Sequence, residues 1–441
     1  MPPEAEIVSA IGRALTLQQR GQLGGARALL EGVLERAPDH PDALHFLGLV
    51  LHQQGEQGPA VERLERAVAV APQNLDAWNN LGGVVAEADP ARAEACFRRV
   101  LEAAPAAIAT RANLALTLEK LGRLAEARGQ VSEILRLTPD DPEALANLAR
   151  LSRATGDHAA SVAAGERLYA LRPSEKLKAA VSRSYFLWFD AVDRDPEVAK
   201  KVAAAWRAFD PSDPVAEHML AALRGGQAPA RASDRYVARH FDEFAPTFDQ
   251  TLRALGYRGP EHAAVALKRA LPEAKGDLDI VDLGCGTGLL GPLVRPFARR
   301  LVGVDLAAKM LERAAEQGTY DELVQREVTA FLLGHPQSFD VALCLDTLVY
   351  IGDLEPVVRA LASSLRPGGC FVFTIELLAD APPGATYSLH VAGRYAHAEP
   401  YVRATLAAHG LVVEHAEPIV VRIEYGEPVL GLVTTARLAS A

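Results

Sequence analysis

An acidic residue and three glycines on alternate positions lie early in the second half of the chain: Asp282, Gly284, Gly286 and Gly288. The short, mostly apolar run 278–281 leads into them and an apolar helical pattern follows, so the sequence predicts a strand, a tight turn and a helix. Glycine removes side chains from such a turn, so a ligand can contact bare backbone N–H groups near a helix start, where the dipole favours negative charge. We therefore expect a nucleotide-like ligand with a carboxylate or a phosphate at this turn.

The spacing of the glycines separates two classes of cofactor. The dinucleotide fingerprint Gly-x-Gly-x-x-Gly would need a glycine where this chain has Leu289, which disfavours a nicotinamide or flavin cofactor. The pattern Asp-x-Gly-x-Gly-x-Gly instead resembles motif I of the class I S-adenosylmethionine-dependent methyltransferases. A second short apolar strand ends at Asp305, about 20 residues further on, where such folds bind ribose hydroxyls. The resemblance implies S-adenosylmethionine as the cofactor.

The same resemblance implies further cofactor contacts. Glu327 takes the place of an acid that meets the adenine amino group, although Asp is usual there. Phe248 lies in the segment 241–249, which is similar to the segment that closes over the cofactor in quinone-biosynthesis-type methyltransferases; an amphipathic helix packed on the sheet or on the first half of the chain is the alternative. The expected cofactor site is Asp282, Gly284, Cys285, Gly286, Gly288, Asp305, Leu306, Glu327, Val328, Leu343 and Phe248.

Candidate catalytic residues follow the fourth expected strand or lie in the insertion after the fifth. The sulfonium of the cofactor already makes the methyl group electrophilic, so the protein must mainly hold a nucleophile in line, and a base is needed only if the nucleophile arrives protonated. We expect His397 as the first choice for a base, followed by Asp346 and Tyr350, with Arg394 as a clamp for a carboxylate or phosphate. Turn, core, loop and ion-pair roles are the alternatives for these four residues.

Composition limits the classes of function. The chain has 441 residues, 49% of them hydrophobic and 23% charged, which predicts a soluble protein of two domains. The net charge of −10 lacks the basic excess that nucleic-acid binding needs. No signal peptide and no membrane-span run is evident, so we expect a cytoplasmic protein. Four widely spaced cysteines suggest neither a metal site nor a disulfide framework.

The first half of the chain is a repeat. Prolines recur at Pro38, Pro72, Pro105, Pro139 and Pro173, with steps of 34, 33, 34 and 34 residues. Apolar and small residues recur in the same register as two helices per unit, a pattern that resembles the tetratricopeptide repeat. Such a stack predicts an all-α solenoid with five recognisable repeats.

The predicted domains follow from these patterns. Residues 1–225 form the solenoid, which ends in a degenerate sixth pair and a capping helix; residues 226–233 are a linker; residues 234–441 form a Rossmann-like α/β domain. Five alternating strands and helices followed by a hairpin predict a seven-stranded, mostly parallel sheet with a C-terminal antiparallel addition. Within this domain, the segments 346–354 and 393–397 are similar to bacterial proteins in which such repeats are fused to a methyltransferase.

Three asparagines recur along the solenoid at steps of 33 and 34 residues: Asn80, Asn113 and Asn147. Their amides would line the concave groove, where they could donate to and accept from an extended peptide. A structural role in the repeat is the alternative.

Three hypotheses about function follow. The first is a methyltransferase for a small molecule, whose repeats dock a protein partner or form a homodimer. The second is a protein or peptide methyltransferase with its substrate in the groove. The third is a scaffold that binds the cofactor without turnover.

Overall fold

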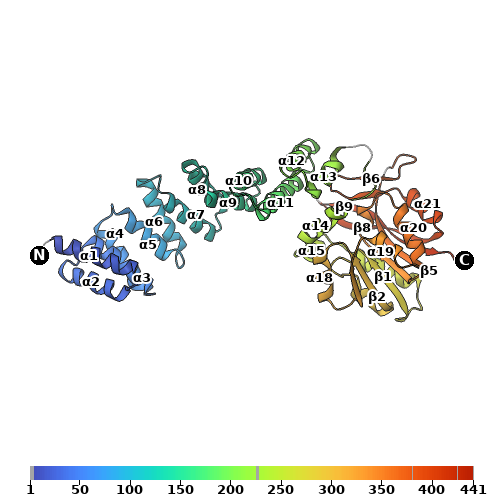
Figure 1. Ribbon diagram of the computed structural model, residues 1–441, viewed down its shortest axis with the longest axis horizontal. Coiled ribbons are helices and arrows are strands. Elements are labelled where there is room, and N and C mark those ends of the chain that lie inside the picture. The colour runs from blue at the N-terminus through green and yellow to red at the C-terminus, as the bar shows by residue number, and fades with distance from the viewer. Residues whose placement is uncertain (1–3, 225–227, 380, 425, 441) are drawn as a thin grey trace. The chain divides into compact units, whose positions relative to one another are not determined.

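The computed structural model describes residues 4–224, 228–379, 381–424 and 426–440. The chain divides into two compact units, Met1–Trp188 and Phe189–Ala441 (Figure 1).

The first unit is helical. Consecutive helices pack against each other as antiparallel pairs, from α1 with α2 to α9 with α10, which confirms the predicted helical repeat. Its helices are α1 Glu4–Gln19, α2 Leu23–Arg36, α3 Pro41–Gln53, α4 Gln57–Val70, α5 Leu75–Val85, α6 Pro90–Ala103, α7 Ile108–Lys120, α8 Leu124–Leu137, α9 Pro142–Ala154, α10 His158–Leu171 and α11 Glu175–Val192, which crosses into the second unit.

Small residues set the spacing of the paired helices. A Cβ added to Gly48 would lie 2.6 Å from Cγ of Leu64, and one added to Gly82 would lie 2.7 Å from Cε1 of Phe97. Side chains at either glycine would therefore push the two helices of a pair apart. Helix starts are fixed locally as well, since the Asn74 side chain accepts a hydrogen bond from the backbone N–H of the third residue of α5.

The second unit contains the remaining helices: α12 Pro196–Phe209, α13 Pro214–Arg224, α14 Asp234–Phe244, α15 Phe248–Ala254, α16 Gly259–Ala270, α17 Gly291–Val294, α18 Ala308–Glu316, α19 Val328–Leu333, α20 Glu355–Ser364 and α21 Glu399–Ala408. Its strands are β1 Leu278–Leu283, β2 Ala298–Asp305, β3 Glu322–Gln325, β4 Phe339–Cys344, β5 Leu365–Leu377, β6 Tyr387–Leu389, β7 Tyr395–His397, β8 Leu411–Glu424 and β9 Glu427–Leu438.

Helices α12 and α13 belong to this second unit, whereas the sequence places them at the end of the solenoid. Part of the predicted linker, residues 226 and 227, lies outside the described residues. The domain boundaries at 225 and 234 stay a prediction.

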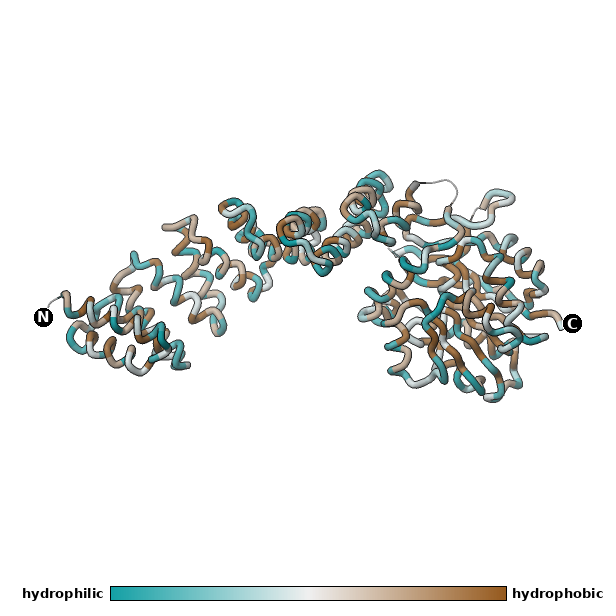
Figure 2. Tube along the Cα trace, in the orientation of Figure 1, coloured by the Kyte–Doolittle hydropathy of each residue, from teal (hydrophilic) through white to brown (hydrophobic). Residues whose placement is uncertain are grey.

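The described strands form one mixed sheet in the order β3-β2-β1-β4-β5-β7-β6, with β9 joined to β5 and β8 to β9. Strands β1 to β5 pair in parallel with their neighbours, and β9 pairs with β5 in the antiparallel sense. This order confirms the predicted mostly parallel sheet with its C-terminal hairpin. Figure 2 shows apolar residues concentrated in the strands at the centre of this unit, as expected for a sheet covered on both faces.

Local structure departs from the sequence prediction at two elements that frame the site. The helix after the glycine turn, α17, has four residues and continues as a short 3₁₀ turn. The sequence run 322–328 predicts a third strand up to Val328, but β3 ends at Gln325, because the Glu327 side chain accepts a hydrogen bond from Ala330 N and so begins α19. Within the described residues, no helix is both long and apolar enough to cross a membrane.

Candidate active site

The glycine turn follows β1, and side chains at its glycine positions would block its backbone. Gly284, Gly286 and Gly288 all have positive φ, at 74°, 55° and 85°. A Cβ on Gly284 would collide with the side chain of Thr347. One on Gly286 would lie 3.8 Å from the Phe248 ring, which covers the turn. At its glycines, the backbone of the turn carries no side chain and lies between the side chains of Thr347 and Phe248.

Asp305 fixes this turn from the neighbouring strand. Its carboxylate accepts hydrogen bonds from Gly286 N at 2.9 Å and Ala307 N at 2.8 Å. Strands β1 and β2 are parallel neighbours with Leu283 opposite Val304, so their carboxyl ends meet at one edge of the sheet. Burial raises the pKa of Asp305, while the backbone N–H groups oppose that rise.

Asp282 lies beneath the turn and is 2% exposed. Its Oδ2 accepts a hydrogen bond from the Tyr320 hydroxyl at 2.7 Å. Burial raises the pKa of Asp282 to about 7; the Tyr320 hydrogen bond lowers it, and the nearby Asp305 charge raises it further. The carboxyl group can therefore change its charge within the physiological pH range.

A cavity opens over this edge of the sheet and brings together most of the predicted site. The predicted cofactor residues that line it are Asp282, Gly284, Cys285, Gly286, Asp305, Leu306, Glu327, Val328 and Phe248. The predicted catalytic residues that line it are Asp346, Tyr350 and Arg394. These predicted residues come from β1, β2, α19, α15 and the segments after β4 and β6. The fold brings them together around one cavity.

Two predicted cofactor residues do not line the cavity. Gly288 faces helix α18, where an added Cβ would lie 3.1 Å from the Tyr320 ring and 3.4 Å from Ala314 Cα. Leu343 is fully buried in the core of the sheet. Leu345, two residues later, lines the cavity instead, because it lies beyond the end of β4 at Cys344, where the chain leaves the sheet.

Glu327 has one carboxylate oxygen that accepts no hydrogen bond among the described residues. Its Oε2 accepts the hydrogen bond from Ala330 N at 2.8 Å. Its Oε1 is buried without a hydrogen bond among the described residues, and Arg231 Nη1 approaches it at 3.5 Å. A buried acceptor of this kind suits a ligand amino group.

Aromatic side chains from α14 and α15 form one wall of the cavity. Phe241, Phe244 and Phe248 line it and contact one another edge to face, with ring centroids 5.2 to 6.1 Å apart. The wall is tied to the glycine turn by a 2.6 Å hydrogen bond from Thr287 Oγ1 to Asp249. Whether this wall moves as a lid stays a prediction.

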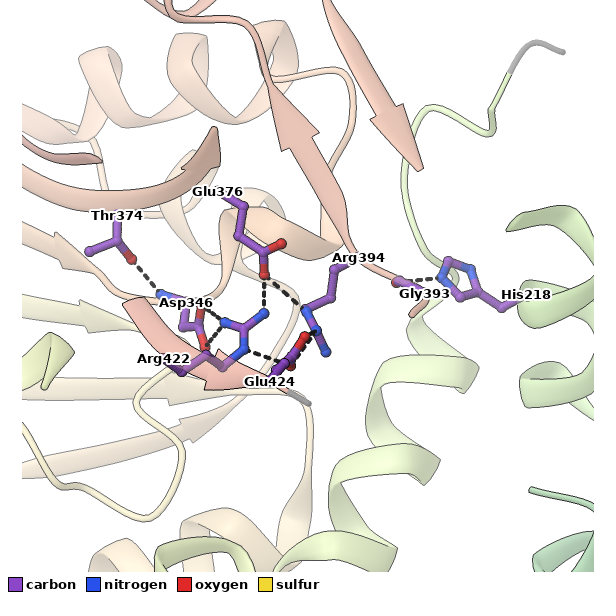
Figure 3. A network of polar contacts seen from close by, with 8 residues as sticks. All are labelled: His218, Asp346, Thr374, Glu376, Gly393, Arg394, Arg422 and Glu424. Atoms are coloured by element: carbon purple, nitrogen blue, oxygen red, sulfur yellow. Dashed lines mark hydrogen bonds and ion pairs between the residues drawn. The ribbon is translucent and has the colours of Figure 1, made fainter. Parts of the chain in front are cut away.

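Five charged residues form a network, and all of them except Glu376 line the cavity (Figure 3). Arg422 binds Asp346, Glu376 and Glu424, and Arg394 binds Glu376 and Glu424. Asp346 follows β4 in a left-handed conformation, with φ at 51°, and its backbone N–H donates to Thr374 Oγ1 at 2.8 Å. Arg394, predicted as a substrate clamp, is thus already paired with two carboxylates of the chain.

His397 lies away from the cavity. Its ring is fully buried on β7, and Nε2 donates to the Ile351 carbonyl at 2.8 Å. Burial lowers the pKa of His397 to about 4. This position provides no contact with a ligand in the cavity. Tyr350 does line the cavity, and burial raises the pKa of its hydroxyl to about 12.

Three members of the charged network are absent from the sequence prediction: Glu376, Arg422 and Glu424. A signal for them exists, since Glu376 ends the apolar run of β5 and Arg422 interrupts the apolar run of β8. Charged residues in the middle of a sheet are rarely buried unless they are paired. Their partners lie on segments that are far apart in the sequence, so only the structure shows which residues pair.

The three asparagines of the proposed peptide groove lie in the first unit, half-buried on α5, α7 and α9. Asn80 Nδ2 lies 2.7 Å from His45 Nε2, and Asn113 Nδ2 lies 3.5 Å from Asn79 Oδ1 in the preceding repeat. Asn147 accepts a hydrogen bond from Arg150 at 3.4 Å. These amides therefore already link side chains of adjacent or the same repeats.

Family comparisons agree with both halves of the fold. Residues 6–73 and 84–151 match models described as tetratricopeptide repeat, and residues 281–373 match a model described as a methyltransferase domain. The chain thus carries N-terminal tetratricopeptide repeats followed by a methyltransferase domain.

Curated relatives match part of the second half. A protein named ubiquinone biosynthesis O-methyltransferase from Xanthomonas campestris pv. campestris (strain B100) is 29% identical over 153 residues, which are 32% of this chain and 62% of that protein. Its namesake from Pectobacterium carotovorum subsp. carotovorum (strain PC1) is 33% identical over 127 residues, covering 27% of this chain and 53% of the relative. The chain therefore spans between half and two thirds of the length of these relatives. A solved S-adenosylmethionine dependent methyltransferase from Mesorhizobium loti is 27% identical, covering 41% of this chain and all of its own, with a TM-score of 0.32.

Proposed function

We propose that this chain, in which tetratricopeptide repeats precede a methyltransferase domain, transfers a methyl group from S-adenosylmethionine to a hydroxyl oxygen of a small molecule. One observation carries the proposal: the cavity joins the glycine turn and Asp305 to a second, separately built polar end that contains Asp346. The relatives named ubiquinone biosynthesis O-methyltransferase support oxygen as the acceptor atom.

The residues at the first end fit the proposed cofactor. The positive-φ glycines leave room for a ligand against the backbone, Asp282 and Asp305 offer carboxylates to its ammonium and ribose groups, and Glu327 Oε1 offers a free acceptor to the adenine amino group. When bound, S-adenosylmethionine supplies a methyl group that leaves its sulfonium, with the electron pair of the broken carbon–sulfur bond staying on sulfur.

Asp346 is best placed among the predicted residues to handle the proton of the acceptor. Its carboxylate lines the cavity and its longest contacts within the network, 3.3 and 3.4 Å to Arg422, leave it loosely held. Burial raises the pKa of Asp346, which makes the carboxylate a stronger base. In this role it would accept the hydroxyl proton as the oxygen bonds to the methyl carbon. His397 lies outside the cavity, so a structural role in β7 suits it better than the role of a base.

The repeats are proposed to dock a protein partner or a second copy of the chain, as their family suggests. Methylation of a peptide held by Asn80, Asn113 and Asn147 is the second candidate, supported by the regular placement of these amides on the first helix of three successive repeats. A triple change of these asparagines to Ala in the full chain separates the two. Unchanged kcat/KM on the true acceptor would rule out presentation in the groove.

Calorimetric titration with S-adenosylhomocysteine tests the cofactor assignment. Wild-type protein should bind it, and Asp305→Ala should weaken binding by about tenfold or more, the typical effect of losing a charged hydrogen-bond acceptor. Glu312→Ala, an exposed acid on α18, serves as the control and should bind normally. No binding by folded wild-type protein would refute the assignment.

A further inference from the structure

The charged network at the acceptor end has more negative than positive groups. Three carboxylates, Asp346, Glu376 and Glu424, surround two guanidinium groups, Arg394 and Arg422. The balance is one negative charge in excess.

The guanidinium groups are committed to these carboxylates. The Arg422 side chain is 3% exposed; its Nε donates to Glu424 at 2.8 Å, and its two Nη atoms donate to Asp346 and Glu376. Arg394 donates from Nε to Glu376 at 2.9 Å and from Nη2 to both oxygens of Glu424 at 2.5 Å. An anionic ligand bound by Arg422, or by Nε and Nη2 of Arg394, would have to displace one of these charge-assisted bonds; Nη1 of Arg394 takes part in none of them.

The loop that carries Arg394 is itself held in place. His218 of α13 lies 2.9 Å from the Gly393 carbonyl through Nε2 (Figure 3). The ring of His218 stacks on Tyr236, with 4.1 Å between the ring centroids. Gly393 has φ at 78°, and a Cβ there would lie 3.0 Å from Met219 Cε. The backbone next to Arg394 is therefore packed against α13 and Tyr236, which opposes a swing of the arginine toward a ligand.

No other cation compensates the excess within the described lining of the cavity. Arg231 is the remaining arginine there, and it pairs with Asp234 at 2.7 Å and with Glu327. His240 also lines the cavity, but burial lowers its pKa to about 4, so it is neutral at pH 7.

The carboxylates that face the cavity offer acceptors. The side chain of Asp346 is 25% exposed and that of Glu424 is 23% exposed, whereas Glu376 behind them is nearly covered. Apolar groups from Phe241, Phe244 and Leu255 line the same space. The space thus suits a ligand with an apolar or aromatic body and a polar group that donates hydrogen bonds.

We propose that the acceptor end of the cavity selects methyl acceptors that carry no net negative charge and that donate a hydrogen bond from a hydroxyl or amino group. This inference rests on the proposed function and narrows its substrate class. Under this proposal, Arg394 does not clamp an anionic substrate. It serves instead as a fixed counter-ion for Glu376 and Glu424.

Three 1,2-dihydroxybenzenes that differ in the charge of the side chain provide the test: 4-ethylcatechol, dopamine and 3,4-dihydroxyphenylacetate. Their binding to the full-length protein saturated with S-adenosylhomocysteine is measured by calorimetry at pH 7. The neutral and cationic compounds should bind at least about tenfold more tightly than the carboxylate. Equal or tighter binding of the carboxylate, or no binding by any of the three, would overturn the proposal.

Failure of the proposed function is a separate result. If S-adenosylhomocysteine itself does not bind, the cofactor assignment fails, and the same three compounds titrated into cofactor-free protein still decide the charge preference.

A variant that lacks one negative charge tests whether charge causes the difference in binding among the three compounds. Glu424→Gln removes the excess negative charge and should reduce the discrimination against the carboxylate to less than about threefold. Glu417→Gln changes an exposed glutamate of the same strand and should leave the discrimination unchanged. Discrimination that survives Glu424→Gln in full would contradict the charge argument; a Glu424→Gln protein that does not fold leaves the wild-type series to decide.

Discussion

Asp282, which is buried, and Asp346, whose side chain is 25% exposed, lie at the ends of two neighbouring parallel strands, and desolvation raises the pKa of both carboxyl groups. Their surroundings differ: a neutral hydroxyl from Tyr320 faces Asp282, whereas the Arg422 guanidinium faces Asp346. An arginine favours the charged carboxylate far more than a hydroxyl does. The two acids are therefore suited to different tasks, one at the proposed cofactor site and one at the proposed acceptor site.

The first prediction concerns the pH dependence of cofactor binding. Because the pKa of Asp282 lies at about 7, the carboxyl group is mostly neutral at pH 6 and mostly ionised at pH 8. A cationic ligand binds the ionised form better, so the Kd of S-adenosylmethionine should fall by up to about tenfold across this range. Calorimetry at the two pH values measures the change.

The control for this pH dependence is Asp282→Asn, which cannot ionise. Its Kd should follow only the titration of the ligand. A wild-type pH dependence that Asp282→Asn reproduces in full would show that Asp282 is not the titrating group.

The second prediction separates the two candidate bases. Asp346→Asn should lower kcat for a hydroxyl acceptor by about 100-fold, the usual effect of losing a general base, with binding of S-adenosylhomocysteine unchanged. His397→Gln keeps a donor for the Ile351 carbonyl and should leave kcat within about threefold while lowering the melting temperature. A large loss of kcat in His397→Gln and none in Asp346→Asn would reverse the assignment.

Helix α13 has a position that bears directly on the cavity. The sequence makes it a cap of the solenoid, yet His218 and Met219 pack against Gly393, next to Arg394 of the acceptor end. An element that precedes the methyltransferase domain therefore supports the wall of its cavity. A truncation at residue 225 would remove this support together with the repeats, so it could not isolate the role of the repeats.

The third prediction tests that support. His218→Ala should raise the KM of the acceptor by about tenfold, with little change in kcat and none in the Kd of S-adenosylhomocysteine, because only the acceptor end loses a contact. His218→Gln can still donate to the Gly393 carbonyl and should restore most of the affinity. Equal effects of Ala and Gln, or a parallel loss of cofactor binding, would indicate general destabilisation instead.

Elements with strong periodic patterns were predictable from the sequence. The helix pairs, the parallel strands and the C-terminal hairpin follow from apolar periods and turn residues. The short strands β6 and β7 were not, since each has three residues and lies in an insertion with little periodicity. The pairing of β7 with β5, and of β6 with β7, places Arg394 in the cavity and His397 outside it, two outcomes that three residues of sequence cannot distinguish.

The same contrast holds for the site. Backbone-binding motifs are local, so Asp282, Gly284, Gly286 and Asp305 could be found as spaced residue types. The charged network joins residues of β5, β8 and two loops that lie up to 76 positions apart, as between Asp346 and Arg422. Only the folded sheet brings such partners together.

At the scale of the whole molecule, two units of different architecture share one chain, and each has its own buried core. The repeats match a family that commonly mediates protein contacts, while the cofactor residues and the acceptor-end network both lie within the second unit. We therefore expect the full chain to turn over a small acceptor without any added protein partner, the repeats directing where or with what it acts.

Release of S-adenosylhomocysteine tests this central claim most directly. Purified full-length protein is incubated with S-adenosylmethionine and a hydroxylated small molecule such as 4-ethylcatechol, with the Asp305→Ala variant run in parallel. The account predicts acceptor-dependent release of S-adenosylhomocysteine by the wild-type protein and a loss of about tenfold or more in Asp305→Ala at subsaturating cofactor. Cofactor binding without acceptor-dependent release from any hydroxylated, uncharged or cationic compound would contradict it.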